Sequence, residues 1–473
     1  MIWIAFGLSL IILAAFWIQL PPIFAFIRRV RSGVNTPVTG LSLARHSHLA
    51  AAVHGASRVH YPGRQEKSFH GSVTALLEAP PGVEHPPAKA PRAICVLCLR
   101  GRDPFLQECL EGLLQQDYPE YDVLIIVDSE IDPAFEAVHR VLDRFPREKR
   151  RAREVWVEVL ENIYPHCALK ASALIQAARE IRSETYEVVA LLDADIVPHP
   201  TWLAELVAPF EDPDVGVTSG NRWYMPEDAS WGSLIRYVWN AGAVVQMFWN
   251  RFTWGGSVAL RKELFCDREL SARWRRSLST DTVIYQVAKH HGWKTCFVPS
   301  VLMVNRESCS VRRLFPWITR QLLVGKLYHP GWPWVIGHGL GTSVILLAGG
   351  LFSLWAFWQG FLVAAFLVLG ALLLYWAGNV WVLGSLENAV QEVLSRRGQA
   401  VHWLRPKVWA RLILAMPMAQ FLNAAALLAT FFVRSVTWRG IVYRLEGRRI
   451  VMEGYRPYCP TGRGLATSSR HSL

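Results

Sequence analysis

The chain has 473 residues, of which 52% are hydrophobic, and its formal net charge at pH 7 is +12. This hydrophobic fraction, with 21 tryptophans, exceeds that of an ordinary soluble protein and indicates a membrane protein of two or three domains. A positive balance can indicate nucleic-acid binding, but the sequence has no basic stripe with interleaved aromatic residues, so we expect no nucleic acid among the partners. Anionic lipid headgroups are the expected partner of the basic residues.

The N-terminal segment, residues 1–31, is predicted to be a transmembrane anchor. An apolar run from Ile2 to Leu20 is long enough to span a bilayer, and Arg28, Arg29 and Arg31 follow it. No basic residue precedes the run and no small-residue cleavage site follows it, so we expect a retained anchor and not a signal peptide. Because basic residues stay on the cytoplasmic side, the part of the chain that follows these arginines is expected in the cytoplasm.

A Gly/Pro-rich linker at 32–91 leads into a segment, 92–300, in which short apolar runs alternate with helical ones. The expected strands cover 93–99, 122–127, 154–160 and 188–192, and the expected helices cover 104–115, 133–144, 168–182 and 282–290. This alternation predicts an α/β domain with a mostly parallel sheet, whose ligands bind at the carboxyl ends of the strands.

The strand at 188–192 ends in two carboxylates, Asp193 and Asp195. At a strand-to-loop turn both can converge on one hard cation, Mg²⁺ or Mn²⁺, that carries a diphosphate, and a sugar nucleotide would fit such a site. The alternative is that they only cap the helix expected after Pro198.

Polar residues also follow the first two strands: Arg100 to Asp103 after one, and Asp128 after the other. Since the carboxyl ends of parallel strands meet at one edge, these groups are expected to share a crevice with Asp193 and Asp195. Ordinary loop acids are the alternative reading.

Five further residues, in three segments, point to the same site. Lys170 opens a predicted helix, where it can reach a phosphate or a sugar hydroxyl, or else only be solvated. Trp254, Gly255 and Gly256 combine an aromatic platform with glycines that let a ligand approach the backbone, although a plain tight turn would look the same. Asp281 precedes a predicted helix and is either its N-cap or a catalytic base on the acceptor side.

The C-terminal part is expected to contain interfacial helices at 301–333 and a transmembrane region at 334–433. Its apolar stretches cover 334–358, 361–386 and 412–433. With the anchor these make about four spans, which would leave the basic tail outside, against the positive-inside rule. A re-entrant turn at Pro417 or Asn423 would remove this conflict, and we expect the basic and disordered tail, 434–473, at the cytoplasmic interface.

These segments together resemble the inverting family 2 glycosyltransferases with the GT-A fold, and most closely their ceramide glucosyltransferase branch. The resemblance rests on LRGRDP, DYPEYDVLIIVDSEIDPA, WGGSVALRKELF, STDTVIYQVAKHHGWK and, near the end, WRGIVYRLEG. The family's helix motif is similar to WITRQ here, which keeps Arg320 and differs on both sides of it.

The resemblance implies a GT-A, Rossmann-like catalytic domain with transmembrane α-helices, and it implies a role for each matched residue. Asp128 would contact the nucleotide base, Asp193 and Asp195 would hold the metal and the diphosphate, and Asp281 would act as general base. Lys170 and Arg320 would lie at the donor, and the leaving diphosphate would be stabilised by the metal and Arg320.

The expected function is therefore transfer of a sugar, glucose or a close relative, from a UDP-sugar to a lipid hydroxyl, with formation of a β-linked glycolipid. The acceptor would be of ceramide type, a diacylglycerol or a related lipid. Two alternatives remain: a polysaccharide synthase of the same family, and a non-catalytic membrane scaffold that binds nucleotide sugar or lipid.

Overall fold

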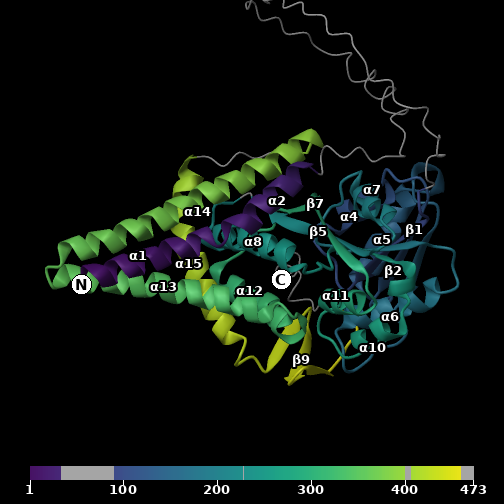
Figure 1. Cartoon of the computed structure of the whole chain (residues 1–473). Helices are drawn as coiled ribbons and strands as arrows, with labels where there is room; N and C mark the ends of the chain where they lie inside the picture. Colours follow the sequence, from purple (N-terminus) through teal and green to yellow (C-terminus); the bar gives the residue numbers. More distant parts are fainter. Residues whose placement is uncertain (33–89, 227, 400–405, 460–473) are drawn as a thin grey trace, which may run out of the picture. The chain divides into compact units, whose positions relative to one another are not determined.

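The computed structural model describes residues 1–32, 90–226, 228–399 and 406–459. Most of the linker expected at 32–91 and the end of the expected tail, 460–473, lie outside these ranges. Figure 1 follows the chain from the N-terminal helices through the α/β domain to the second set of long helices and a small C-terminal sheet.

The α/β domain is built on a seven-stranded sheet with the order β3-β2-β1-β4-β6-β5-β7. Six strands run in one direction, and β6 is antiparallel to its neighbours β4 and β5. The strands are β1 (Ala93–Leu99), β2 (Tyr121–Val127), β3 (Val155–Val159), β4 (Val188–Leu192), β5 (Val215–Tyr224), β6 (Ser257–Arg261) and β7 (Lys294–Asn305). Every residue of β2 and β4 is buried, as in strands that are covered on both faces. The expected α/β class with a mostly parallel sheet is confirmed.

Helices connect the strands and cover the sheet. They are α4 (Leu106–Leu114), α5 (Pro133–Arg144), α6 (Leu169–Ile181), α7 (Trp202–Val207), α8 (Trp231–Asn250), α9 (Lys262–Phe265), α10 (Arg268–Trp274), α11 (Asp281–His290) and α12 (Val311–Tyr328). The sequence explains α5 well: Asp132 caps it by accepting the N–H of Ala134 at 2.8 Å, and Pro133 occupies its first turn. Asp132 also accepts the N–H of Gly101, which joins the loops after β1 and β2.

The expected bounds agree with the structure for β1, β4 and α5, whose sequences carry the clearest apolar pattern. The catalytic domain extends past the predicted boundary at residue 300, because β7 runs to Asn305 and pairs with β5 along its length.

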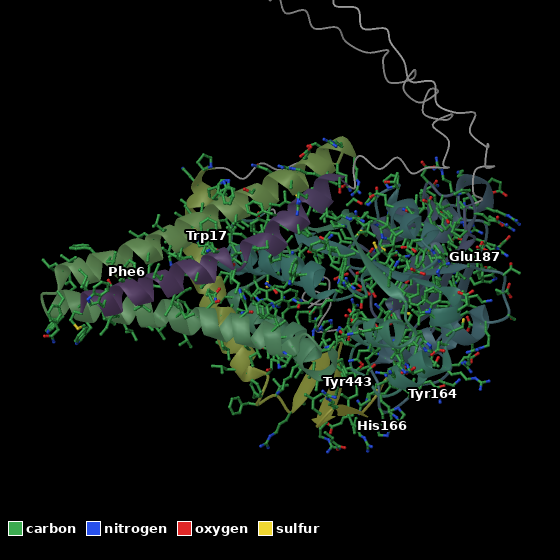
Figure 2. All side chains as sticks on the ribbon, in the orientation of Figure 1. Phe6, Trp17, Tyr164, His166, Glu187 and Tyr443 are labelled. Carbon is green, nitrogen blue, oxygen red and sulfur yellow. The ribbon has the colours of Figure 1, made fainter. Side chains whose placement is uncertain are left out.

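Within the described residues, four helical segments are long and apolar enough to cross a membrane. The first joins α1 (Ile2–Trp17) to α2 (Leu20–Ser32), and the others are α13 (Trp332–Trp358), α14 (Leu362–Arg396) and α15 (Pro406–Ala429). Large apolar side chains such as Phe6, Trp17, Leu354 and Trp358 are exposed on this set, as on surfaces that face lipid, and Figure 2 marks the first two.

The helix α15 differs from the others in what its ends contact. Near its start, Arg411 donates to the carbonyl of Ala229, which lies just before α8. Arg397, which follows α14 and precedes α15 in the chain, forms an ion pair with Glu205 of α7. At the other end, Lys326 of α12 donates to the carbonyl of Thr430 at 2.8 Å. Both ends therefore adjoin the α/β domain, and Figure 1 shows α15 running across α13 and α14. The helix continues through Pro417 and Asn423, so neither residue forms the re-entrant turn that the sequence suggested.

The beginning of the expected disordered tail is ordered. Its strands β8 (Ser435–Trp438), β9 (Ile441–Glu446) and β10 (Arg449–Glu453) form an antiparallel sheet. The physical reason is a two-residue alternation, in which Ile441, Tyr443, Ile450 and Met452 are buried against the domain core and the residues between them are more exposed. The Tyr443 hydroxyl accepts the N–H of Leu169 at 3.2 Å, and Figure 2 shows this tyrosine near Tyr164 and His166.

Candidate active site

A cavity of about 200 Å³ lies at the carboxyl ends of β1, β2 and β4, where a parallel sheet is expected to bind its ligand. Eight of the nine predicted site residues line it: Asp128, Lys170, Asp193, Asp195, Trp254, Gly255, Asp281 and Arg320. We call it the donor cavity. Its lining carries five basic and five acidic side chains, so it is highly charged and close to neutral as a whole.

Asp193 and Asp195 follow β4 and face this cavity, and they do not cap a helix. The next helix, α7, begins at Trp202 with Thr201 as its N-cap residue, which removes the capping alternative. The backbone N–H of Asp193 donates to the carbonyl of Gly256 at 3.2 Å, and this bond ties the end of β4 to the glycine loop.

Asp195 is partly buried, with 16% of its side chain exposed, and its carboxylate has few hydrogen-bond partners. Its Oδ2 lies 3.5 Å from Arg222 Nη1, whereas Oδ1 has no hydrogen-bond partner within the described part of the chain. Burial raises the pKa of Asp195 to about 6; Arg222 opposes this shift, and the negative charge of Asp193 adds to it. A buried carboxylate oxygen without a partner is the kind of ligand that a hard divalent cation takes.

Two carboxylates fit a metal ion that completes its coordination with other oxygens. Within the described ranges, the one group of three or more acidic, histidine or cysteine side chains close enough for a metal is Glu269, His290 and His291, on another part of the surface. Asp193 and Asp195 would thus supply two ligands, and the remaining positions open into the cavity. Mg²⁺ in particular is usually held by one or two carboxylates together with substrate phosphates and water.

Lys170 lies in the first turn of α6 and is largely buried. Its ammonium group contacts Asp193 Oδ1 and donates to the carbonyl of Gly255 at 3.1 Å. Burial alone would lower the pKa of Lys170, but the adjacent Asp193 charge outweighs it and the net shift is upward. The lysine is therefore a fixed cation inside the cavity, and simple solvation of a helix face does not describe it.

Asp281 is the first residue of α11 and is held in one orientation. Its Oδ2 accepts the N–H of Gly255 at 2.9 Å, and its Oδ1 accepts the N–H of Thr282 at 2.8 Å and the hydroxyl proton of Ser279. A Cβ on Gly255 would lie 3.2 Å from that of Asp281, so a glycine allows the close approach. The N-cap residue of α11 is Thr280, so Asp281 is not the N-cap, and its carboxylate lines the cavity.

Gly256, the ninth predicted residue, does not line the donor cavity and instead makes room for Trp254. A Cβ at position 256 would lie 2.2 Å from the Trp254 ring, so the indole can fold over the loop only because this residue is glycine. The indole in turn faces the guanidinium of Arg222 at 5.5 Å.

Three guanidinium groups gather at the cavity: Arg222, Arg320 and Arg439. Arg320 lies on α12 and is partly buried, and its guanidinium lies 5.2 Å from the ring centroid of Trp438. Burial, with repulsion from the other two arginines, lowers the pKa of Arg320 to about 10. Such a concentration of positive charge favours an anionic ligand beside Arg320.

Arg439 was not among the predicted site residues. It lies between β8 and β9 with φ +47° and forms a two-pronged pair with the buried Asp103, at 2.9 and 2.8 Å. It also donates to the carbonyl of Arg100 at 2.6 Å. Both ends of this pair stand in segments that carried the family resemblance, LRGRDP and WRGIVYRLEG, but their pairing spans 336 positions of sequence.

A model of glycosyl transferase family 21 matches residues 69–451 of the chain. The chain belongs to glycosyl transferase family 21. It is also 31% identical, over 75 residues, to ceramide glucosyltransferase from Komagataella phaffii; this match covers 16% of the chain and 13% of that protein. These matches confirm the resemblance to ceramide glucosyltransferases. The family number differs from the predicted one, because the matching model is that of family 21 and the motifs suggested family 2.

Solved structures with a similar chain path include a mannosyltransferase from Pyrobaculum calidifontis in complex with GDP-Man and Mn²⁺. It is 16% identical with a TM-score of 0.41, over 90% of this chain and 99% of that one. Another is glucosyl-3-phosphoglycerate synthase from Mycobacterium tuberculosis, 14% identical with a TM-score of 0.32, over 50% and 77% of the two chains. Because both TM-scores are below 0.5, we draw no conclusion from them.

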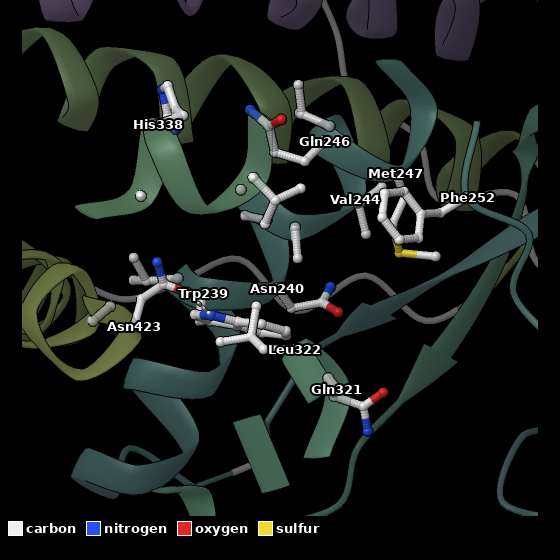
Figure 3. Close-up of a pocket in the computed structure, with 18 of the residues that line it drawn as sticks. Trp239, Asn240, Val244, Gln246, Met247, Phe252, Gln321, Leu322, His338 and Asn423 are labelled. Atoms are coloured by element: carbon white, nitrogen blue, oxygen red, sulfur yellow. Dashed lines mark hydrogen bonds between the residues drawn. The ribbon is translucent and has the colours of Figure 1, made fainter. Parts of the chain in front are cut away.

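The family 21 chain has a second cavity, of about 350 Å³, among α8, α12, α13, α14 and α15. We call it the helix chamber. It is mostly apolar, with amide groups interspersed, and Figure 3 shows Trp239, whose indole N–H donates to Asn423 Oδ1 at 2.9 Å. The helix chamber and the donor cavity share six lining residues: Arg222, Trp254, Asp281, Trp317, Gln321 and Val324. The two spaces therefore meet at Asp281.

Proposed function

We propose that this protein transfers a sugar, glucose in the first instance, from a UDP-sugar to a lipid hydroxyl with inversion, forming a β-linked glycolipid. The observation that carries the proposal is the meeting of a charged cavity with a mainly apolar chamber at one carboxylate, Asp281. A charged donor and an apolar acceptor need separate binding spaces and a shared point of reaction.

The donor side would hold the nucleotide sugar by its charges. Asp193 and Asp195 would bind Mg²⁺ or Mn²⁺, which neutralises the diphosphate and favours its departure. Arg320, with Arg222 and Arg439 beside it, would stabilise the negative charge that develops on the leaving diphosphate. Lys170 would position Asp193, and Asp128 would accept a hydrogen bond from the base.

The chemical step assigned to Asp281 is a proton transfer. Its carboxylate would take the proton of the acceptor hydroxyl while that oxygen attacks the anomeric carbon from the side opposite the diphosphate. One C–O bond forms, the bond to the diphosphate breaks, and the configuration inverts. The hydrogen bonds from Thr282 and Ser279 to Oδ1 and from Gly255 to Oδ2 hold the carboxylate, and a lone pair of Oδ2 remains for the proton of the acceptor.

The acceptor side is the helix chamber, which would admit a lipid of ceramide type, a diacylglycerol or a related molecule from the bilayer. The basic residues Arg28, Arg29 and Arg31 after the first apolar helix support a cytoplasmic position for the catalytic domain. A scaffold that only binds nucleotide sugar or lipid would not need a carboxylate, Asp281, where the donor cavity meets the helix chamber, and this favours an enzyme.

The proposal is tested by incubating the detergent-purified protein with labelled UDP-sugars, mixed membrane lipids and Mg²⁺ or Mn²⁺. We expect label to enter the organic phase with at least one UDP-sugar, and to stay in the aqueous phase when the divalent ion is chelated. Long labelled polymers would favour the polysaccharide synthase instead. Failure of every nucleotide sugar to react would favour the scaffold.

A further inference from the structure

The last described residues, Gly454–Cys459, seat against the side chain of Asp128, and we call them the C-terminal strap. The Tyr455 hydroxyl donates to Asp128 Oδ1 at 2.9 Å, and the backbone N–H of Tyr458 donates to Oδ2 at 2.8 Å. Arg100 also contacts Oδ2, and the Asp128 side chain has no exposed surface. Donors from this chain therefore engage both oxygens of the carboxylate.

Arg100 fixes the strap in place. Its guanidinium donates to the carbonyl of Arg456 at 3.1 Å, and it lies 5.7 and 5.5 Å from the ring centroids of Tyr455 and Tyr458. Gly101, which has φ +74°, makes room for the Tyr458 ring. A Cβ at position 101 would lie 2.9 Å from an atom of that ring, so a side chain there would collide with it. The strap thus has a defined seat on the loop after β1.

The strap contacts the wall of the donor cavity at Asp128, which follows β2, and the strand order β2-β1-β4-β6 shows which end of the cavity this is. The cavity opens to the helix chamber at Trp254 and Asp281, so the sugar must lie at that end. The diphosphate belongs at Asp193, in the middle. The nucleoside is left with the far end, where Asp128 and the apolar Leu160 line the wall.

We propose that the C-terminal strap occupies the nucleoside end of the donor cavity when no donor is bound, and that donor binding requires the strap to leave Asp128. This inference rests on the proposed function. A nucleobase such as uracil presents an N–H donor, and in this conformation the N–H of Tyr458 and the hydroxyl of Tyr455 take the acceptor positions that it would need. The strap and the base therefore compete for one carboxylate.

The effect of the strap on the apparent Kd of the nucleotide depends on the fraction of molecules in which the strap contacts Asp128. If it is seated in 90 to 99% of molecules, the apparent Kd of the nucleotide is weakened by about 10- to 100-fold, and removing the strap recovers that factor.

The test is the Kd of UDP, measured by calorimetry on detergent-purified proteins in the presence of Mn²⁺. A chain that stops after Glu453, the last residue of β10, lacks the strap. A chain that stops after Cys459 is its matched control, and Tyr455→Phe removes one hydroxyl from the full-length chain. We expect the first to bind UDP about tenfold or more tightly, Tyr455→Phe a few-fold more tightly, and the control like the full-length protein.

The other outcomes overturn the inference in distinguishable ways. Weaker UDP binding without the strap would make it part of the nucleotide site and not a competitor. Equal binding in all the proteins would show that the strap and the nucleotide do not meet, while leaving the proposed function in place. Failure of UDP, GDP and ADP to bind either the full-length or the shortened chain would overturn both proposals.

Discussion

Asp195 is the residue on which the proposed metal site depends most. Its Oδ1 is buried and has no hydrogen-bond partner within the described residues, whereas Asp193 already contacts Lys170. The environment of Asp195 therefore disfavours the ionised carboxylate by itself, and a bound divalent cation would stabilise that ionised form.

We expect Asp195→Asn to raise the Mn²⁺ concentration needed for half-maximal turnover by about tenfold or more, because one of two charged ligands is lost. The UDP Kd should weaken with it, since donor binding is expected to depend on the metal. Asp212→Asn is a suitable control, because Asp212 is paired with Lys294 on the surface. A metal titration that is unchanged in Asp195→Asn would remove this residue from the site.

At the scale of elements, the small C-terminal sheet is attached to the catalytic domain through Arg439. Its partner Asp103 is buried on the loop after β1, and burial raises the pKa of that carboxyl although Arg439 opposes the shift. Loss of the guanidinium would leave a buried carboxylate without its partner.

Arg439→Ala should therefore lower the stability by about 3 kcal/mol, seen as a lower Tm in detergent, and should also weaken UDP binding. Adding Asp103→Asn should recover part of the Tm, since no buried charge is then unpaired, while UDP binding stays weak. If Arg439→Ala has the same Tm and the same UDP Kd as the unaltered protein, the Arg439–Asp103 pair neither stabilises the fold nor contributes to UDP binding.

The elements that the sequence predicted are those whose signal is local. Apolar runs marked β1 and β4, and the charged residues after the strands marked the site, so Asp128, Asp193 and Asp195 can be identified from the amino-acid sequence alone. The pairing of Arg439 with Asp103 cannot, because contact between positions so far apart depends on the whole fold. The C-terminal sheet was overlooked because its arginines hide a two-residue alternation of apolar side chains.

At the scale of the whole molecule, α15 decides the topology. Both of its ends adjoin the α/β domain, through Arg411 at one end and Thr430 at the other. We therefore expect α15 to lie at the interface on the side of the catalytic domain, and three other segments to cross the bilayer. This places the basic residues after α15 on the cytoplasmic side, in agreement with the positive-inside rule.

Cys459 offers a test of this topology, because it is the exposed cysteine of the eight. In a bacterial host we expect a membrane-impermeant maleimide to label Cys459 in broken membranes and not in intact spheroplasts. Cys459→Ser should lose that label, which identifies the site. Labelling in intact spheroplasts would place the tail, and with it the catalytic domain, outside.

The most direct test of the account is lipid-dependent release of UDP by the unaltered protein and by Asp281→Asn. The asparagine can still accept the N–H of Gly255, so the loop should keep its geometry. We predict a fall in turnover of about 10²- to 10⁴-fold, as for loss of a positioned general base, with little change in the Kd of UDP. Turnover close to that of the unaltered protein would contradict the assignment of Asp281, and with it the claim that sugar transfer takes place where the two cavities meet.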